Sequence, residues 1–352
     1  MITVQFKLTP TIEQAQKLSS SSVEYIRCVN NIVRSIVSAE EPIKPTSATV
    51  QAILPSAVKN EAIRAAKSVV AKFKKGKCDS LPILKKPVIT WNNQNFKIEK
   101  DKISFPLLID GKSKRIQVSC VLTDYQRERL NAKHGTLRIT LKNGKWIAQV
   151  AVEPQTNEPP QSGVMGVDLG LKNPAVAVTD TGTTRFFGNG RMNKYMKRQF
   201  RSRRKKLSVS KNQKAIDKLG NKEQRWMKDQ DHKISREIVN FAKDNGVSEI
   251  RLEQLQNIRN TARTSRKNEK NLHAWSFYRL AMFILYKAAL VGISVEFVNP
   301  AYTSQKCPVC EKMNHAKDRK YKCLCGFVSH RDRVGAINII SAPVVSDKRK
   351  LA

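Results

Sequence analysis

Three acidic residues stand where a carboxylate could bind a divalent metal ion. Asp168 interrupts the segment GVMGVDLGLK (163–172), whose apolar residues otherwise predict a buried β-strand. Burying an ionised carboxylate is costly unless a cation or hydrogen-bond donors compensate its charge. Glu253 lies near the end of the segment SEIRLEQL, and Asp332 precedes the segment RVGAINII. Taken singly, the three could be a turn residue, an exposed strand-end acid and a helix N-cap, so a metal site requires that they come together.

Carboxylates of this kind suit the hydrolysis of a phosphodiester. Mg²⁺ and Mn²⁺ prefer carboxylate oxygens and water as ligands, whereas cysteine suits softer metals. Two such ions held about 4 Å apart activate a water molecule and stabilise the departing 3′ oxygen. We therefore expect Asp168, Glu253 and Asp332 to be catalytic and to hold two Mg²⁺ (or Mn²⁺) ions, with Asp168 shared between them.

The cysteines predict a second and different metal site. Four of the seven cysteines fall in the segments CPVC and CLC, namely Cys307, Cys310, Cys323 and Cys325. In a cytosolic chain such clustering indicates metal binding rather than disulfide bonds. Four thiolates close the coordination sphere of one Zn²⁺, so this ion is expected to be structural. Because the second pair is CxC and not CxxC, His315 and His330 stay open as alternatives for the fourth ligand.

The overall charge indicates a polyanionic partner. The 352 residues include 65 Lys and Arg but 29 Asp and Glu, which gives a net charge of +36. Nucleic acid explains this excess better than a membrane surface, because no long apolar run, lipidation motif or amphipathic anchor is visible. The first residues, MITVQFKLTP, lack the apolar core of a signal peptide, so a cytoplasmic location is expected.

Two basic segments are expected to contact phosphate groups. Residues 191–207 hold nine Lys or Arg and no acid, and such charges repel one another without a counterion. Residues 259–280 follow Glu253 and should lie near the catalytic site, and Arg331 beside Asp332 could neutralise the scissile phosphate. The expected nucleic-acid contacts are Arg191, Lys197, Arg198, Arg201, Arg203, Arg204, Arg263, Arg266, Lys267 and Arg331.

The first half of the chain predicts a β domain with a helical insertion. Residues 2–8 alternate as a half-buried strand, and apolar residues then recur at helical spacing, with a second helical stretch from about 47 to 74 interrupted near Pro55. Residues 87–153 predict mostly strands, including a hairpin whose Asn143-Gly144 suits a type I′ turn. The proline-rich segment that follows, EPQTNEPPQSG, predicts a linker between two domains.

The second half predicts an RNase H-like α/β domain. Three short strands come first, at 164–169, 175–179 and 184–187. After them the sequence predicts helices at about 191–207 and 222–245 and a strand that ends near Glu253. Another helix, another strand, the cysteine cluster and a closing helix come next. In a domain with this order, an acid on the first strand, one at the end of the fourth and one on the late helix converge. Asp168, Glu253 and Asp332 occupy those places.

Three segments resemble the TnpB family of transposon-encoded RNA-guided nucleases. The three RuvC motifs and the zinc ribbon of that family are similar to GVDLGLKNPAVAV, IRLEQLQNIR and CPVC…KCLCGFVSHRDRVGAINI. One departure is Val334-Gly335, where the family more often has Asn-Ala, and this should change helix packing but not the ligand. The resemblance implies this division: a wedge β-barrel (1–10 and 86–155) with an inserted helical recognition bundle (11–85), a linker (156–162), a RuvC-like nuclease domain (163–300 and 331–345), an inserted four-cysteine zinc ribbon (301–330) and a basic tail (346–352).

The resemblance also implies partners and an activity. The protein would bind a guide RNA derived from the transposon end and cut double-stranded DNA beside a short target-adjacent motif. A non-guided RuvC-like transposase or resolvase is an alternative on the same fold, although the first half of the chain has no evident role in one. A regulator that binds nucleic acid without cutting is a further alternative, against which the three acids argue.

Overall fold

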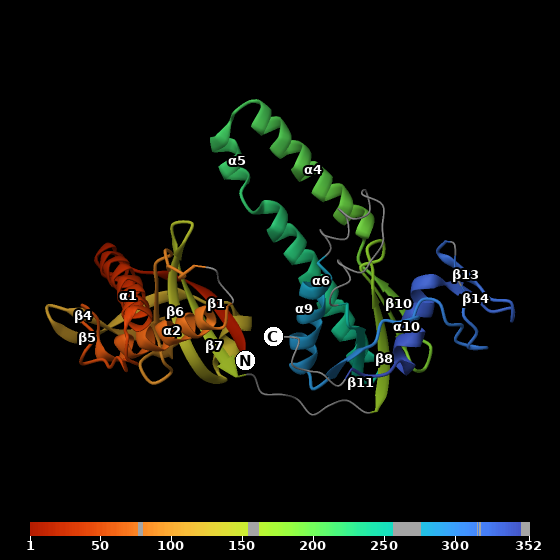
Figure 1. Cartoon of the computed structure of the whole chain (residues 1–352), viewed down its shortest axis with the longest axis horizontal. Helices are drawn as coiled ribbons and strands as arrows, with labels where there is room; N and C mark the ends of the chain where they lie inside the picture. The colour runs from red at the N-terminus through yellow and green to blue at the C-terminus, as the bar shows by residue number, and fades with distance from the viewer. Residues whose placement is uncertain (77–79, 154–161, 256–275, 315, 317, 346–352) are drawn as a thin grey trace. The chain divides into compact units, whose positions relative to one another are not determined.

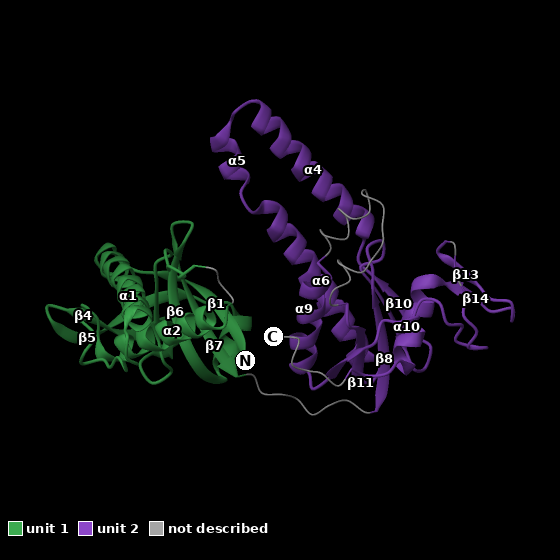
Figure 2. Ribbon diagram, viewed as in Figure 1, with its two compact units in different colours: residues 1–155 green, residues 156–352 purple. Residues whose placement is uncertain are grey.

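The chain forms two compact units, Met1–Gln155 and Thr156–Ala352, which Figure 2 colours separately. The computed structural model describes residues 1–76, 80–153, 162–255, 276–314, 316 and 318–345. Residues 156–161 of the expected linker and the expected basic tail, 346–352, lie outside the described residues. None of the described helices is both long enough and apolar enough to cross a membrane.

The first unit is built on one seven-stranded sheet with the order β2-β6-β7-β1-β5-β4-β3. The predicted hairpin turn is present, since Asn143 and Gly144 have φ angles of 51° and 70° and so suit a type I′ turn. No ladder joins β2 to β3 among the described residues, so closure of the sheet into a barrel stays a prediction. The strands are β1 (Ile2–Thr9), β2 (Val88–Trp91), β3 (Lys97–Glu99), β4 (Lys102–Ile109), β5 (Lys112–Val121), β6 (Lys133–Lys142) and β7 (Lys145–Glu153).

The helices of the first unit share a single hydrophobic core with its sheet. The helices are α1 (Ile12–Ser38), α2 (Ser56–Lys74) and the short α3 (Asp124–Leu130). Val29 of α1 and Val58 of α2 are fully buried in the same core as Trp91 of β2. The predicted helix from residue 47 was wrong at its start, because α2 begins only after Pro55, a residue whose ring fits the start of a helix and not its interior. A separate recognition bundle stays a prediction.

The second unit contains a mixed five-stranded sheet with the order β10-β9-β8-β11-β12. Its first three strands lie where the sequence predicts them and are antiparallel, whereas β11 runs parallel to β8 and β12. Leu252 pairs with Val167, so the next residues along the two parallel strands, Glu253 and Asp168, lie near the same end of the sheet. The strands are β8 (Gly163–Leu169), β9 (Ala175–Thr179), β10 (Thr184–Phe187), β11 (Val247–Glu253) and β12 (Ser294–Val298).

Helices cover the sheet of the second unit and extend beyond it. Met165, Val167 and Leu169 of β8 pack in one core with α6 (Lys222–Asp244) and α9 (Phe277–Ala289). Alternate residues of a strand face opposite sides, so Gly166 and Asp168 face α10 (Arg331–Ser341) instead. A Cβ at Gly166 would lie 2.1 Å from the carbonyl oxygen of Ala336, which shows how closely α10 crosses β8.

A helical hairpin and a small two-stranded sheet complete the second unit. The basic helix α4 (Gly190–Val209) leads to the short α5 (Gln213–Leu219), and the chain returns along α6 (Figure 1). Only Gly190 and Phe200 of α4 are buried, so most of this helix is open to solvent. The cysteine-rich segment contributes β13 (Lys320–Lys322), which pairs antiparallel with β14 (Val328–His330) directly before α10.

Candidate catalytic pocket and metal centre

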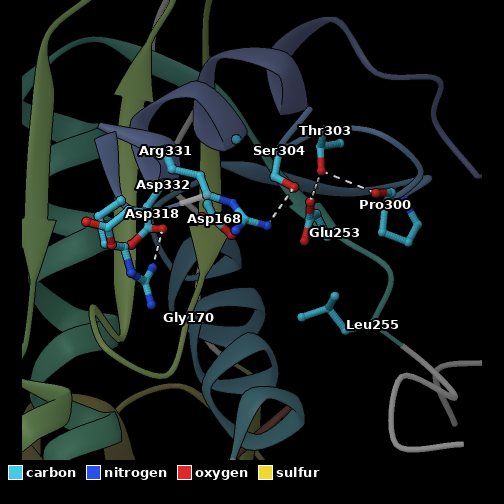
Figure 3. A pocket seen from close by; sticks show the side chains of 12 residues that line it. Asp168, Gly170, Glu253, Leu255, Pro300, Thr303, Ser304, Asp318, Arg331 and Asp332 are labelled. Atoms are coloured by element: carbon cyan, nitrogen blue, oxygen red, sulfur yellow. Dashed lines mark hydrogen bonds and ion pairs between the residues drawn. The ribbon is translucent and has the colours of Figure 1, made fainter. Parts of the chain in front are cut away.

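The three predicted acids line one pocket of the second unit, with a volume of about 470 Å³. Figure 3 shows Asp168 and Asp332 on one side of it and Glu253 beside Thr303 on the other. The acids come from β8, the end of β11 and the first turn of α10, which are the three places that the sequence predicts. Strand register brings the first two together, and the close crossing of α10 over β8 brings the third.

The carboxyl group of Asp168 is electrostatically perturbed in this pocket. Burial raises the pKa of its carboxyl group well above the usual value, and the neighbouring charges of Glu253 and Asp332 raise it further. Arg319 and Arg331 oppose this effect without cancelling it. The side chain is half-buried and opens on the pocket, so a cation could reach it. A carboxylate with excess negative charge around it is a favourable place for a divalent cation.

Glu253 is held by a threonine that the sequence does not single out. Burial raises the pKa of this carboxyl group, and a hydrogen bond from the Thr303 hydroxyl partly opposes the rise. The same hydroxyl lies 3.2 Å from the carbonyl oxygen of Pro300, so it can donate to either acceptor. Thr303 is 6% exposed and follows β12, which places it across the pocket from β8.

Asp332 is held at both carboxylate oxygens. The side-chain amide of Asn173 donates to Oδ2 at 2.8 Å, and the guanidinium of Arg319 donates to Oδ1 at 2.6 Å. The backbone N–H of Asp332 donates to Nδ1 of His330, which caps α10 at 3.2 Å. Sequence reasoning missed Asn173 and Arg319, and also Asp318, a further acid that lines the pocket. Asn173 follows the strand of Asp168 by a few residues, which is the only sequence signal that could have indicated it.

The donor set of the pocket fits a hard divalent cation. It offers carboxylate oxygens, whereas no histidine or cysteine is among the described residues that line it. Burial, and after it the charges of Glu253 and Asp332, raise the pKa of Asp168, and a bound cation would oppose this effect. Mg²⁺ and Mn²⁺ bind such oxygen ligands with water completing the coordination sphere.

The four predicted cysteines come together in the second unit. Their sulfur atoms all lie within 4.8 Å of one another, and no other such group of three or more possible ligands occurs in the described part of the chain. The Sγ atoms of Cys307 and Cys325 are 3.7 Å apart and those of Cys310 and Cys323 are 3.5 Å apart. Four sulfurs around Zn²⁺ at about 2.3 Å would be about 3.8 Å apart, so the cluster fits zinc.

Without metal, the cluster favours ionisation at Cys307 and not at Cys323. At Cys323 a hydrogen bond from the backbone at Cys325 lowers the pKa, but burial and hydrogen bonds with the neighbouring thiols outweigh it and raise the pKa to about 12. Burial opposes ionisation of the Cys307 thiol, but hydrogen bonds from the backbone at Cys310 and Val309 outweigh it and lower the pKa to about 7. Metals bind the thiolate, so this shift favours binding. Of the alternative ligands, His330 instead caps α10 and packs edge-on against Phe186, while His315 lies outside the described residues.

The residues expected to contact nucleic acid differ in exposure. Lys197 is half-buried close to Glu223 and Asp231, and burial lowers its pKa, while Arg204 pairs with Glu223. Arg331 lines the pocket. The predicted contacts at Arg263, Arg266 and Lys267 lie outside the described residues. Four predicted residues of α4 are exposed and free to meet a phosphate backbone: Arg191, Arg198, Arg201 and Arg203.

Comparison with known proteins identifies the family. Family models described as "Probable transposase" and "Cas12f1-like, TNB domain" match residues 148–259 and 277–339. A TnpB-like protein of Methanocaldococcus jannaschii is 32% identical over 262 residues, which cover 69% of this chain and 91% of that protein. The chain belongs to the TnpB family. The resemblance drawn from its motifs is thereby confirmed.

More distant relatives of this TnpB protein are CRISPR-associated enzymes. The endodeoxyribonuclease Cas12f1 of Sulfoacidibacillus thermotolerans is 28% identical over 68% of this chain, and the match spans 59% of that enzyme. The cryo-EM structure of a Cas12f1–sgRNA–target DNA complex matches with a TM-score of 0.70 at 17% identity, covering 94% of this chain and 82% of that one. At this identity the likeness shows a shared fold, which is that of Cas12-type effectors with a RuvC nuclease domain.

Proposed function

We propose that this TnpB-family protein is an RNA-guided, divalent-metal-dependent DNA endonuclease. The observation that carries the proposal is the convergence of Asp168, Glu253 and Asp332 on one pocket, where burial and mutual repulsion raise the pKa of Asp168. The family supports the same conclusion, since its Cas12f1 relatives are named endodeoxyribonucleases. The reaction is hydrolysis of a DNA phosphodiester.

The residues of the pocket have distinct roles in this proposal. Asp168, Glu253 and Asp332 would hold Mg²⁺ or Mn²⁺, which when bound supplies the Lewis acidity that activates water and stabilises the leaving oxygen. Thr303 fixes the orientation of Glu253 through its hydrogen bond. Arg331 also lines the pocket and would bind the scissile phosphate.

The spacing of the acids favours two ions over one. Ligand oxygens on a single Mg²⁺, each bonded at about 2.1 Å, lie at most about 4.2 Å apart. Among the described residues, the three carboxylates do not form a group whose ligand atoms all lie within 4.8 Å of one another. Ions about 4 Å apart accept ligands on opposite sides at roughly twice that span. As they stand, the three carboxylates do not all reach one ion, so the proposal takes two.

Specificity would come from base pairing between a guide RNA and the DNA. The described residues that line the pocket include carboxylates and arginines, which act on any phosphodiester whatever its base. The structural relative was solved with an sgRNA and target DNA, which supports the same two partners here. The exposed arginines of α4 and the net charge of +36 suit a nucleic-acid backbone. A guide derived from the transposon end and a target-adjacent motif complete the proposal.

The test uses purified protein with its copurifying RNA, which is sequenced to obtain the guide. Plasmids carry a matched or scrambled target beside randomised flanks, and Mg²⁺ starts the reaction. We expect cutting of matched plasmids with a restricted flank, and its loss in Asp168→Ala with RNA binding retained. Equal cutting of matched and scrambled plasmids would favour a non-guided resolvase. Binding without any cutting by the unmodified protein would favour a regulator.

A further inference from the structure

A tight turn after β8 carries Asn173 to the third catalytic acid. A Cβ at Gly170 would lie 2.7 Å from the backbone oxygen of Asn173, so the turn can fold this closely only because residue 170 is glycine. The N–H of Gly170 donates to the carbonyl oxygen of Pro174 at 3.3 Å and closes the turn. From this turn, the side-chain amide of Asn173 reaches Oδ2 of Asp332 at 2.8 Å.

The carboxylate of Asp332 therefore accepts hydrogen bonds from two donors, one neutral and one positively charged. Arg319 donates to Oδ1 at 2.6 Å, and the backbone N–H of Arg331 donates to the carbonyl oxygen of Arg319 at 2.7 Å, next to Asp332 itself. The carboxylate is buried, with the residue 7% exposed. The positive charge of Arg319 repels an incoming cation, whereas the neutral amide of Asn173 does not.

We propose that Asn173 is a positioning residue that orients the carboxylate of Asp332 for divalent metal. This inference rests on the proposed function and assigns a residue that works through Asp332. An ionised carboxylate has about four acceptor sites on its two oxygens, so Oδ2 can accept from Asn173 and still bind a cation. Asn173 keeps the carboxylate in place when a cation weakens its contact with Arg319.

The expected effect follows from what such supporting groups do at metal sites. Removing a hydrogen-bond partner that orients a metal ligand typically lowers metal affinity by about 10- to 100-fold. Asn173→Leu removes the donor at similar size and adds no charge. Asn173→Ser serves as the second variant, because its hydroxyl is too short to span the same distance. Lys172→Ala is the matched control, since Lys172 is exposed in the same turn.

The experiment measures Mn²⁺ binding to the full-length, zinc-loaded, RNA-free protein by the loss of the EPR signal of free Mn²⁺. Zinc content and melting temperature are recorded for every variant. We expect Asn173→Leu and Asn173→Ser to bind Mn²⁺ at least roughly tenfold more weakly, with zinc content unchanged and Lys172→Ala equal to the parent.

Asp332→Ala separates this inference from the proposed function. If Asp332→Ala weakens Mn²⁺ binding and neither Asn173 variant does, Asn173 has no positioning role and the metal site stands. If Asp332→Ala itself leaves Mn²⁺ binding unchanged, the proposed metal site is wrong. Loss of zinc or a large fall in melting temperature in both Asn173 variants would make the residue structural and overturn the inference.

Discussion

Gly335→Ala should stabilise the protein and weaken metal binding at the proposed catalytic site at the same time. Gly335 lies inside α10, and glycine in a helix interior costs about 1 kcal/mol relative to alanine. Its backbone is not in the left-handed region, so alanine can adopt the same conformation. Without Mg²⁺ or Mn²⁺, the helix should therefore gain roughly 1 kcal/mol, which corresponds to about 2–4 °C in melting temperature for a domain of this size.

The substitution should displace the carboxylate of Asp168. The new Cβ would lie 3.2 Å from Oδ2 of Asp168, closer than ordinary van der Waals contact, and 3.4 Å from its Cγ, at the limit of such contact. The carboxylate must shift by a few tenths of an ångström, whereas metal–ligand distances tolerate only about 0.2 Å. We expect Mn²⁺ affinity to fall by roughly tenfold, at the low end for groups that orient a metal ligand.

Thermal melting with and without Mn²⁺ measures both effects, because a ligand raises the melting temperature according to its affinity. The control is Gly166→Ala, whose Cβ would lie 2.1 Å from the carbonyl oxygen of Ala336 and should destabilise the fold. If Gly335→Ala melted below the parent protein without metal, the new methyl group would have displaced the backbone of α10 and not the Asp168 side chain. If Mn²⁺ raised the melting temperature of Gly335→Ala by as much as that of the parent protein, the predicted displacement of the Asp168 carboxylate would be refuted.

Three further predictions concern the pocket, the zinc site and α4. Burial raises the pKa of Asp168 in the folded protein above its unfolded value of about 3.9. Without Mg²⁺, stability should therefore fall as pH rises from about 3.9 through the pKa of the folded state. Asp168→Asn should flatten this pH dependence of the melting temperature. Cys307→Ser should lose about one zinc by elemental analysis and should lower the melting temperature, because zinc binding contributes to folding. Arg198→Ala should make the fall of log RNA affinity with log salt less steep, by about one unit of slope. Arg204→Ala should change the slope by less, because Arg204 pairs with Glu223. If Arg198→Ala and the parent protein had equal slopes, phosphate contact by Arg198 would be contradicted.

Asp168 and the four cysteines were noticeable in the sequence because they contradict their local pattern, whereas Glu253 and Asp332 do not. Asp168 interrupts an apolar strand, and the cysteines cluster at metal-binding spacing, so neither needs tertiary structure to be noticed. The strands of the second unit were predictable for the same reason, since β-branched and apolar residues run in short blocks between turn residues. The order of these strands and helices, which is that of an RNase H-like domain, then placed the three acids on β8, β11 and α10.

The residues that hold the acids were not predictable from local pattern. Asn173 meets Asp332 across 159 positions of sequence, and Thr303 meets Glu253 across 50. Such residues lie in turns, where no periodicity distinguishes a polar side chain that faces solvent from one that meets a carboxylate. The start of α2 was misplaced for a related reason, since the segment before Pro55 has helical spacing but begins with turn residues.

The three acids differ in how far the protein itself compensates their charge. Asp332 accepts hydrogen bonds from Asn173 and Arg319, and Glu253 accepts one from Thr303. No residue in the described ranges donates a hydrogen bond to the carboxylate of Asp168, which burial and two like charges also disfavour. The protein thus keeps its least compensated charge at the acid expected to be shared between two ions. Metal binding would relieve this charge, and Asp168→Asn would remove it, which is why that variant is expected to flatten the pH dependence of stability while it damages the site.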